Sequence, residues 1–167
     1  MSRSDAGRLD ALDLKILAVY QGDTREPAHA IGRRVGLSTA AVQRRLKRLR
    51  AHRVIEAEVA QLAPATLGLP VTCIVTVELE REDRGALAAF QERICACPEV
   101  QQCYYVTGQH DFVLVVLAPD LAEYEAFTRR ALLGDANVRA FTTSVALARA
   151  KVGLAVPLDR AGRDARR

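Results

Sequence analysis

Positive charge without any neighbouring acid is concentrated in one short stretch of this 167-residue chain. Eight Arg or Lys residues and no Asp or Glu lie between residues 33 and 53: Arg33, Arg34, Arg44, Arg45, Lys47, Arg48, Arg50 and Arg53. A solvated helix normally mixes charges of both signs, because opposite charges three or four residues apart stabilise it. We therefore expect an anion outside the protein to offset this repulsion, and guanidinium and ammonium groups suit phosphate.

The elements that position these cations are helices. Apolar and basic residues alternate at helical spacing over residues 39–52, with Val42, Leu46 and Leu49 on one side and a cationic face opposite. Ser38 is placed to cap this helix, since its hydroxyl can accept from the unpaired N–H groups of the first turn. Gly36 supplies the turn after a helix over residues 27–35, and another helix is expected over 9–21. Three helices in this order predict a helix-turn-helix.

Residues of the last helix suit the major groove of duplex DNA. Small residues at its start allow close approach, Gln43 and Arg44 can reach base edges, and Arg45, Lys47 and Arg48 can reach phosphates. RNA fits less well, because no aromatic stacking platform accompanies the basic stretch. The predicted DNA interface is Arg33, Arg34, Ser38, Thr39, Ala40, Gln43, Arg44, Arg45, Lys47 and Arg48.

The two halves of the chain also differ in net charge. Residues 1–60 hold 12 basic and 7 acidic side chains, a net of +5, whereas residues 61–167 hold 12 and 13, a net of −1. No apolar run approaches the about 20 residues that span a bilayer, and the first residues lack the apolar core of a signal peptide. We expect a cytoplasmic protein with no membrane partner.

Candidate chemistry elsewhere is sparse. The four cysteines, Cys73, Cys95, Cys97 and Cys103, include no pair at the spacing of zinc knuckles or thioredoxin-like motifs. We expect reduced structural thiols, with a redox switch or an incidental metal site as the alternatives. No catalytic grouping of His, Ser, Cys and Asp recurs at recognisable spacing, and no glycine-rich phosphate loop is present. The prediction is therefore no enzyme, no cofactor and no bound metal.

The second half of the chain alternates strands and helices. Strands are expected over residues 71–79, 100–107, 112–117 and 137–148, and helices over 86–96 and 120–133, with Gly108 in the turn between the middle strands. This order predicts a ferredoxin-like βαββαβ domain and an α+β protein overall. The expected organisation is a flexible start at 1–8, a DNA-binding domain at 9–62, a linker at 63–70, the ferredoxin-like domain at 71–158 and a flexible tail at 159–167.

Several motifs in order resemble the leucine-responsive/AsnC, or feast/famine, regulators of transcription. The matching segments are Leu9-Asp10-x-x-Asp13-x-x-Ile16-Leu17, Val35-Gly36-Leu37-Ser38, Val42-x-Arg44-Arg45-Leu46-x-Arg48-Leu49, Val54-Ile55, Val106-Thr107-Gly108-Gln109-His110-Asp111-Phe112 and Thr142-Thr143-Ser144-Val145. The resemblance implies a winged helix-turn-helix joined to a ferredoxin-like (RAM/ACT-like) domain. It also implies homodimers that assemble further into octamers, and an amino-acid-like effector. The effector residues implied are Gly108, Gln109, His110, Asp111, Thr142, Thr143 and Ser144.

Two departures from the family pattern bear on these expectations. Gln109 and His110 stand where relatives often have an acid followed by an aromatic residue, which removes one anchor for an amine. Arg53 stands where relatives usually have glycine, so a left-handed residue there would be strained or the helix would end differently. The function expected is a sequence-specific, effector-responsive transcriptional regulator. The alternative is an architectural, nucleoid-type DNA-binding protein with little sequence preference and no effector.

Overall fold

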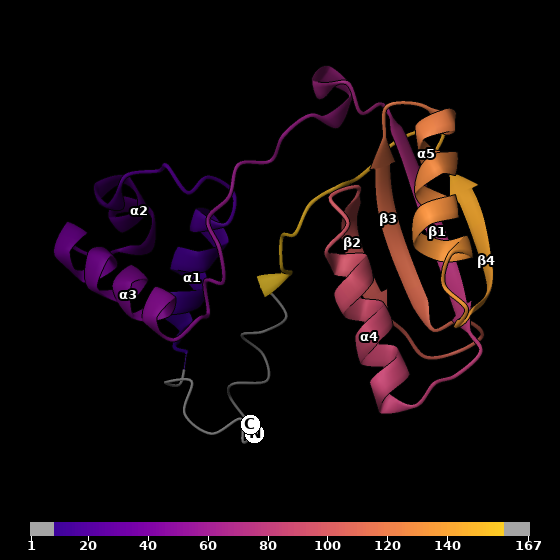
Figure 1. The fold of residues 1–167 in the computed structure, drawn as a ribbon. Coiled ribbons are helices and arrows are strands. Elements are labelled where there is room, and N and C mark those ends of the chain that lie inside the picture. Colours follow the sequence, from indigo (N-terminus) through magenta and orange to yellow (C-terminus); the bar gives the residue numbers. More distant parts are fainter. Residues whose placement is uncertain (1–8, 159–167) are drawn as a thin grey trace. The chain divides into compact units, whose positions relative to one another are not determined.

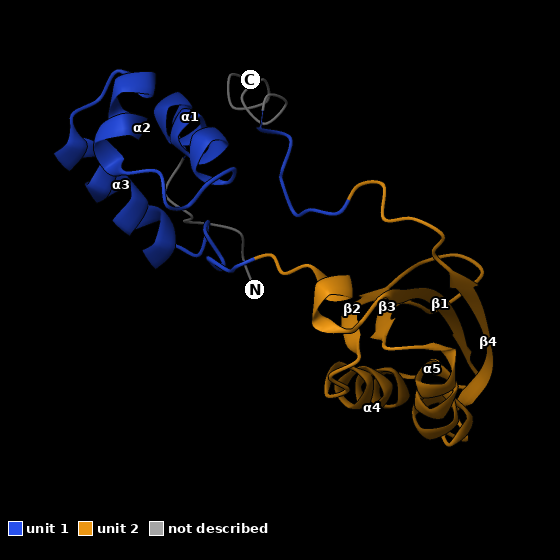
Figure 2. Ribbon diagram, turned by 90° about the horizontal axis from the view of Figure 1, so that it is seen from above, with its two compact units in different colours: residues 1–60, 152–167 blue, residues 61–151 orange. Residues whose placement is uncertain are grey.

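The computed structural model describes residues 9–158, and the chain divides into two compact units. The first contains residues 1–60 and 152–167, and the second contains residues 61–151 (Figures 1 and 2). Across residues 9–158, no helix has the length and apolar character needed to cross a membrane.

The first unit is a bundle of the three expected helices. They are α1 (Ala11–Tyr20), α2 (Ala28–Val35) and α3 (Thr39–Ala51). Each helix contributes apolar side chains at helical spacing to one core, which contains Ile16, Tyr20, Ile31, Val35, Val42 and Leu46. Burial of this shared face, more than helix propensity, holds such short helices together.

Local sequence signals set the helix ends. The Asp10 side chain accepts from the backbone N–H of Asp13, and Asp13 reciprocates, which makes a capping box at the start of α1. Gly36 ends α2 with φ +75°, and the Ser38 hydroxyl accepts from the Ala41 N–H at 3.2 Å, as predicted. Pro27 differs slightly from expectation, because it precedes α2 as the capping residue.

The expected wing is absent from the described residues. The resemblance implies a winged form of the helix-turn-helix, and the alternating residues 54–62 of the sequence favour an extended segment that would supply the wing. Within residues 9–158 the structure assigns no strand before β1 (Val71–Leu79), so residues 54–62 are not part of a sheet there. Alternation in a sequence cannot reveal whether a second strand exists to pair with.

The second unit has the expected strand and helix order. After a 3₁₀ turn at Pro64–Leu67, the elements are β1, α4 (Arg84–Cys95), β2 (Val100–Tyr105), β3 (Phe112–Ala118), α5 (Leu121–Thr128), a π-helical turn (Arg129–Leu133) and β4 (Val138–Val145). The strands form one antiparallel sheet in the order β2-β3-β1-β4. This is the predicted ferredoxin-like topology.

Within residues 61–151, helices cover only one face of this sheet. Figure 2 shows α4 and α5 on the same side of the sheet. The core on this side includes the side chains of Val75, Val77 and Leu114. Because side chains alternate along a strand, Ile74 and Thr76 lie on the opposite face, where Ile74 is 36% exposed. We call this opposite surface the open face.

The chain returns to the first unit after the sheet. The Gln21 side chain, just past α1, donates to the Val156 carbonyl at 3.1 Å and accepts from the Val156 N–H at 2.9 Å. Residues from 152 onward therefore group with the three helices, whereas the sequence led us to include residues up to 158 in the ferredoxin-like domain. The predicted flexible ends, 1–8 and 159–167, lie outside the described residues.

Arg53 adopts the left-handed conformation that we considered for this position, where relatives usually have glycine. Its φ is +54°, a left-handed value at which a Cβ atom is crowded. Arg53→Gly is expected to raise the free energy of unfolding by about 1 kcal/mol, because glycine lacks that Cβ. Urea denaturation followed by circular dichroism measures the change. Arg53→Ala removes the same charge but keeps the Cβ, so an equal gain in this control would assign the effect to charge.

Candidate nucleic-acid interface and effector loop

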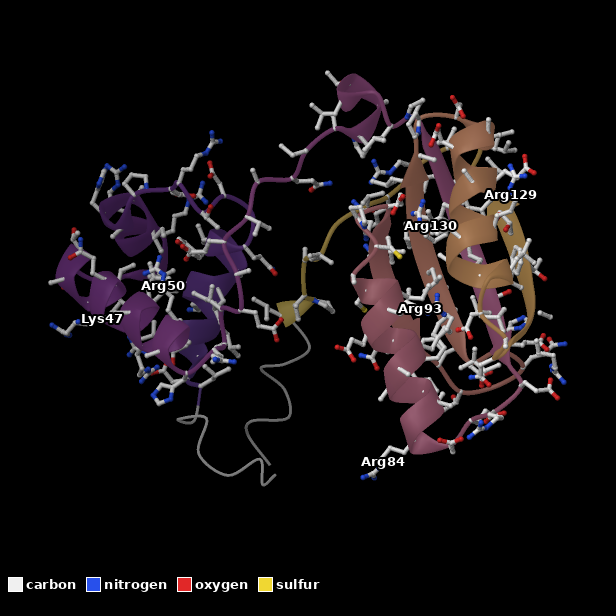
Figure 3. All side chains as sticks on the ribbon, in the orientation of Figure 1. Lys47, Arg50, Arg84, Arg93, Arg129 and Arg130 are labelled. Atoms are coloured by element: carbon white, nitrogen blue, oxygen red, sulfur yellow. The ribbon has the colours of Figure 1, made fainter. Side chains whose placement is uncertain are left out.

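The outward side of α3 presents a compact set of exposed side chains. Ala40, Gln43, Arg44 and Lys47 lie opposite or beside the buried Val42 stripe, and all four are exposed. Neither Arg44 nor Lys47 forms an ion pair with any residue between 9 and 158. In Figure 3 Lys47 extends away from the bundle. We call these four residues the outer face of α3.

Arg45 and Arg48, two of the residues predicted to contact phosphate, form ion pairs with acids of α1 and its cap. The Arg45 Nη1 atom lies 2.7 Å from the Asp13 Oδ1 atom, and Arg48 Nη2 pairs with the Asp13 Oδ2 atom. Asp13 has no exposed side-chain surface, while the Arg45 and Arg48 side chains are 23% and 41% exposed. Arg45 also contacts the Asp10 carboxylate at 2.7 Å. We call Asp13 and its two arginines the α1–α3 clamp.

The clamp corrects the expectation that only an external anion offsets the charge of α3. Hydrogen bonds to Asp10 and Asp13 raise the pKa of Arg45. Burial opposes ionisation of Asp10, yet the Arg45 hydrogen bond brings the Asp10 pKa below its ordinary value. The acids lie more than 30 residues from their partners, so a count of local charges could not find them. The capping-box position of Asp13 was the signal that pointed to an acid at this helix end.

Arg50, on the other flank of α3, is also paired. Its Nε atom lies 2.9 Å from the Glu58 Oε1 atom, and the Tyr20 hydroxyl donates to the same carboxylate oxygen at 2.7 Å. Hydrogen bonds from Tyr20 and Arg50 lower the pKa of Glu58. Figure 3 shows Arg50 lying against the bundle, in contrast to Lys47. This contact attaches the segment after α3 to α1.

The remaining predicted DNA residues lie at the start of α3 and the end of α2. Ser38 and Thr39 are exposed at the first turn of α3, where Ser38 already serves as the cap. Arg33 and Arg34 are exposed in the last turn of α2, and Arg34 contacts Glu26 at 3.2 Å. Arg33 is thus a further exposed cation that has no ion pair among residues 9–158.

The loop between β2 and β3 is held against the end of β1. Gly108 has φ +122°, a conformation that side chains resist, as its sequence position predicted. The Asp111 N–H donates to the Val77 carbonyl at 2.9 Å, and the Asp111 Oδ2 atom accepts from the Leu79 N–H at 2.7 Å. One carboxylate oxygen of Asp111 therefore orders the loop, while Gln109 and Gly108 remain exposed.

An acid that the sequence analysis missed lies beside this loop. The His110 Nδ1 atom is 3.1 Å from the Glu78 Oε1 atom, and Arg139 pairs with the other oxygen of Glu78. The Arg139 hydrogen bond is the main cause that lowers the pKa of Glu78. An acid on the open face of β1, in an otherwise apolar and Thr-rich strand, was the available signal.

The predicted residues of β4 do not all gather at the loop. Register places Ala140 opposite Glu78, Thr142 opposite Thr76 and Ser144 opposite Ile74. At about 3.3 Å per residue, Ser144 lies about 13 Å along the sheet from Glu78. Thr143 points to the helix side, where its hydroxyl contacts the Tyr124 hydroxyl. Thr142 and Ser144 share the open face, and neither side chain forms a hydrogen bond with the loop in the part of the chain that the structure describes.

Known proteins match both units and most of the chain. Residues 9–50 match the AsnC-type helix-turn-helix domain, and residues 72–156 match the Lrp/AsnC ligand binding domain. An HTH-type transcriptional regulator of Sinorhizobium fredii is 44% identical over 154 residues, which are 92% of this chain and 91% of the relative.

Solved structures agree with the sequence matches. An AsnC family transcriptional regulator from Agrobacterium tumefaciens aligns with a TM-score of 0.85 at 32% identity, over 91% of this chain and 99% of that one. The complex of a Neisseria meningitidis transcriptional regulator with L-Met aligns with a TM-score of 0.85 at 29% identity, over 92% and 99%. The two domain matches and this full-length similarity agree in order and extent, so the chain belongs to the Lrp/AsnC family of helix-turn-helix transcriptional regulators.

Proposed function

We propose that this regulator reads a specific DNA sequence with the outer face of α3 and responds to an amino-acid-like effector at the 108–111 loop. The proposal that α3 binds DNA rests on one observation: some cations of α3 are paired with acids of the same unit and others are not. Arg45, Arg48 and Arg50 are neutralised by acids of the same unit, whereas Arg44 and Lys47 face outward beside small residues.

The roles on the outer face follow from side-chain chemistry. Gln43 and Arg44 stand in the early turns of α3, where a recognition helix meets base edges, and both can form paired hydrogen bonds with a base. Lys47 lies one turn further on and acts as a point charge toward phosphate. Arg33, Arg34, Ser38, Thr39 and Ala40 complete the proposed contact surface. Arg45 and Arg48 act mainly by orienting α3 through the clamp.

A second copy of the chain is the partner proposed for the open face. That face is partly apolar, with Ile74 36% and Tyr104 50% exposed, and no helix between residues 71 and 145 covers it. A dimer also presents two recognition helices, as pseudo-palindromic operators require. In such a dimer, Thr142 and Ser144 of one copy could line an effector site together with the 108–111 loop of the other copy. A site shared in this way would require at least two chains.

The effector proposal rests on the loop and on the solved relative with L-Met. Exposed polar groups at Gly108 and Gln109 suit a carboxylate, while Glu78 supplies an acid near the loop for an amine. We propose that the regulator acts in the cytoplasm, where it binds DNA. The proposal includes no catalytic step, cofactor or metal.

A binding experiment tests both parts. A duplex selected from a random library and its scrambled version are titrated with the full chain at physiological salt, and preference for the selected duplex by at least about 10³ is expected. Binding of both within a few-fold would favour the architectural alternative. Thermal shift with a panel of L-amino acids, L-methionine included, tests the effector, because a ligand that binds the folded chain raises its melting temperature. No shift with any member would remove the effector from the proposal and leave the DNA part standing.

A further inference from the structure

The end of α1 holds the segment that returns from the second unit. Residues from 152 onward group with the three helices, and the Gln21 carboxamide bonds to both backbone groups of Val156, at 3.1 Å and 2.9 Å. In an extended backbone the N–H and C=O groups of one residue point to the same side, and Pro157 favours an extended backbone at the residue before it. A carboxamide offers a matching donor and acceptor. We call this pair of hydrogen bonds the latch.

The segment that leaves α3 is attached beside the latch. The Tyr20 hydroxyl donates to the Glu58 carboxylate at 2.7 Å and accepts from the Arg50 Nη2 atom at 2.7 Å. The Arg50 guanidinium also lies 5.6 Å from the centre of the Tyr20 ring. Two adjacent residues at the end of α1, Tyr20 and Gln21, therefore hold both the segment that leads to the second unit and the segment that returns from it.

Hydrogen bonds contribute more than apolar burial to the attachment of the returning segment. The Leu154 and Val156 side chains are 80% and 58% exposed, so little of their apolar surface is removed from water. Gln21 itself is exposed, and the last turn of α1 fixes its backbone through a bond to the Leu17 carbonyl at 2.9 Å. Replacement of the Gln21 side chain would therefore release Val156 without a change in the core of the three helices.

The latch changes how the three helices are joined to the second unit. The covalent chain makes this connection once, through residues 52–60. A single connection through a flexible segment permits the helices to swivel. The latch adds a second attachment, at Val156. Two attachments at one helix end restrict rotations that one attachment permits, and such restriction reduces the entropy lost when the helices dock on a target.

We propose that the latch sets the spacing between two DNA half-sites that the regulator selects. This inference rests on the proposed function, in which two copies of the chain present two recognition helices. When each set of helices is restricted, both copies of α3 reach base edges on the same face of a duplex only at matching half-site separations. Without the latch, each set adapts to other separations and the preference falls. Gln21 is thus a positioning residue, since it contacts no DNA itself.

Amide exchange of the full chain without DNA tests the latch directly. Two-dimensional NMR follows the Val156 N–H group, which donates to Gln21 in the latch. Gln21→Ala is expected to speed exchange of this group by about tenfold, because two hydrogen bonds of ordinary strength are lost. Gln91→Ala is the matched control, since it removes an exposed glutamine from α4, and it should leave the rate unchanged. Equal exchange in the unmodified chain and in Gln21→Ala would overturn the proposal.

A series of duplexes tests the consequence for DNA binding. Each duplex carries two copies of the selected half-site, and their centre-to-centre separation increases by one base pair at a time over about two helical turns. A duplex with a single half-site reports binding by one recognition helix. For the unmodified chain we expect a favoured separation, with a loss of about 10² in affinity when the separation shifts by about half a helical turn. Gln21→Ala should reduce this preference by about tenfold, while its affinity for the single half-site stays within about twofold.

The outcomes separate this proposal from the proposed function. A spacing preference that Gln21→Ala leaves intact, or that Gln91→Ala reduces equally, would overturn the role of the latch. Weaker binding of Gln21→Ala to the single half-site would do the same, because Gln21 would then support α3 itself. Sequence preference without spacing preference in the unmodified chain would refute the latch alone. Absence of sequence preference would refute the proposed function, and the spacing role with it.

Discussion

Replacing Asp13 by alanine is expected to lower the free energy of unfolding by about 3 kcal/mol, because the charge-assisted hydrogen bonds that two arginines donate to a buried carboxylate are lost. Arg45 and Arg48 both contact this carboxylate, which has no exposed surface. The capping bond from the Asp10 N–H to Asp13 is lost as well. Urea denaturation of the full chain, followed by circular dichroism, measures the change.

Asp23→Ala is the matched control for this experiment. The Asp23 carboxylate also contacts an arginine, but its partner Arg25 is 90% exposed. Exposed pairs of this kind contribute at most about 1 kcal/mol. Similar urea midpoints for Asp13→Ala and Asp23→Ala would contradict the importance of the clamp. Asp13→Asn, which keeps the size of the side chain, separates loss of charge from loss of packing.

Arg44→Ala and Lys47→Gln are expected to affect DNA binding in different ways. Loss of an arginine that contacts a base should reduce preference for the selected duplex by about 10- to 100-fold. Loss of a lysine that contacts phosphate should weaken every duplex alike and lower the salt dependence by about one unit of slope. Titrations of selected and scrambled duplexes at several salt concentrations measure both effects.

Lys15→Gln is the control, since it removes the same charge from an exposed position on α1. It should leave both affinities and the salt slope nearly unchanged. If Arg44→Ala weakened all duplexes equally, base reading by Arg44 would be refuted. If Lys15→Gln matched Lys47→Gln, the effect would belong to the net charge of the unit, and the proposed role of the outer face would fail.

Signals that act over a few residues made much of the fold predictable. The hydroxyl of Ser38, the glycine at position 36 and the alternating residues of β1 each act on neighbours in sequence, so their consequences could be read directly. The order of strands and helices in the second half followed from the same local patterns. The π-helical turn after α5 was not expected, because composition does not distinguish it from continued helix.

Contacts between distant residues limited what could be predicted of the site. Asp13 meets Arg45 and Arg48 across more than 30 positions, and Glu78 meets His110 across 32. No local pattern encodes such pairs, since they depend on how helices and strands pack. The sequence therefore identified the basic helix but could not separate the cations that face outward from those that hold α3 in place.

The hydrogen bonds between Gln21 and Val156 have a consequence for building hybrid regulators. A chimera made with a single junction after residue 62 would take residues 152–158 from the protein that donates the ferredoxin-like domain. Gln21 of the recipient would then have to bind the backbone of a different protein at position 156. A better design inserts residues 61–151 of the donor as a cassette between the two recipient segments.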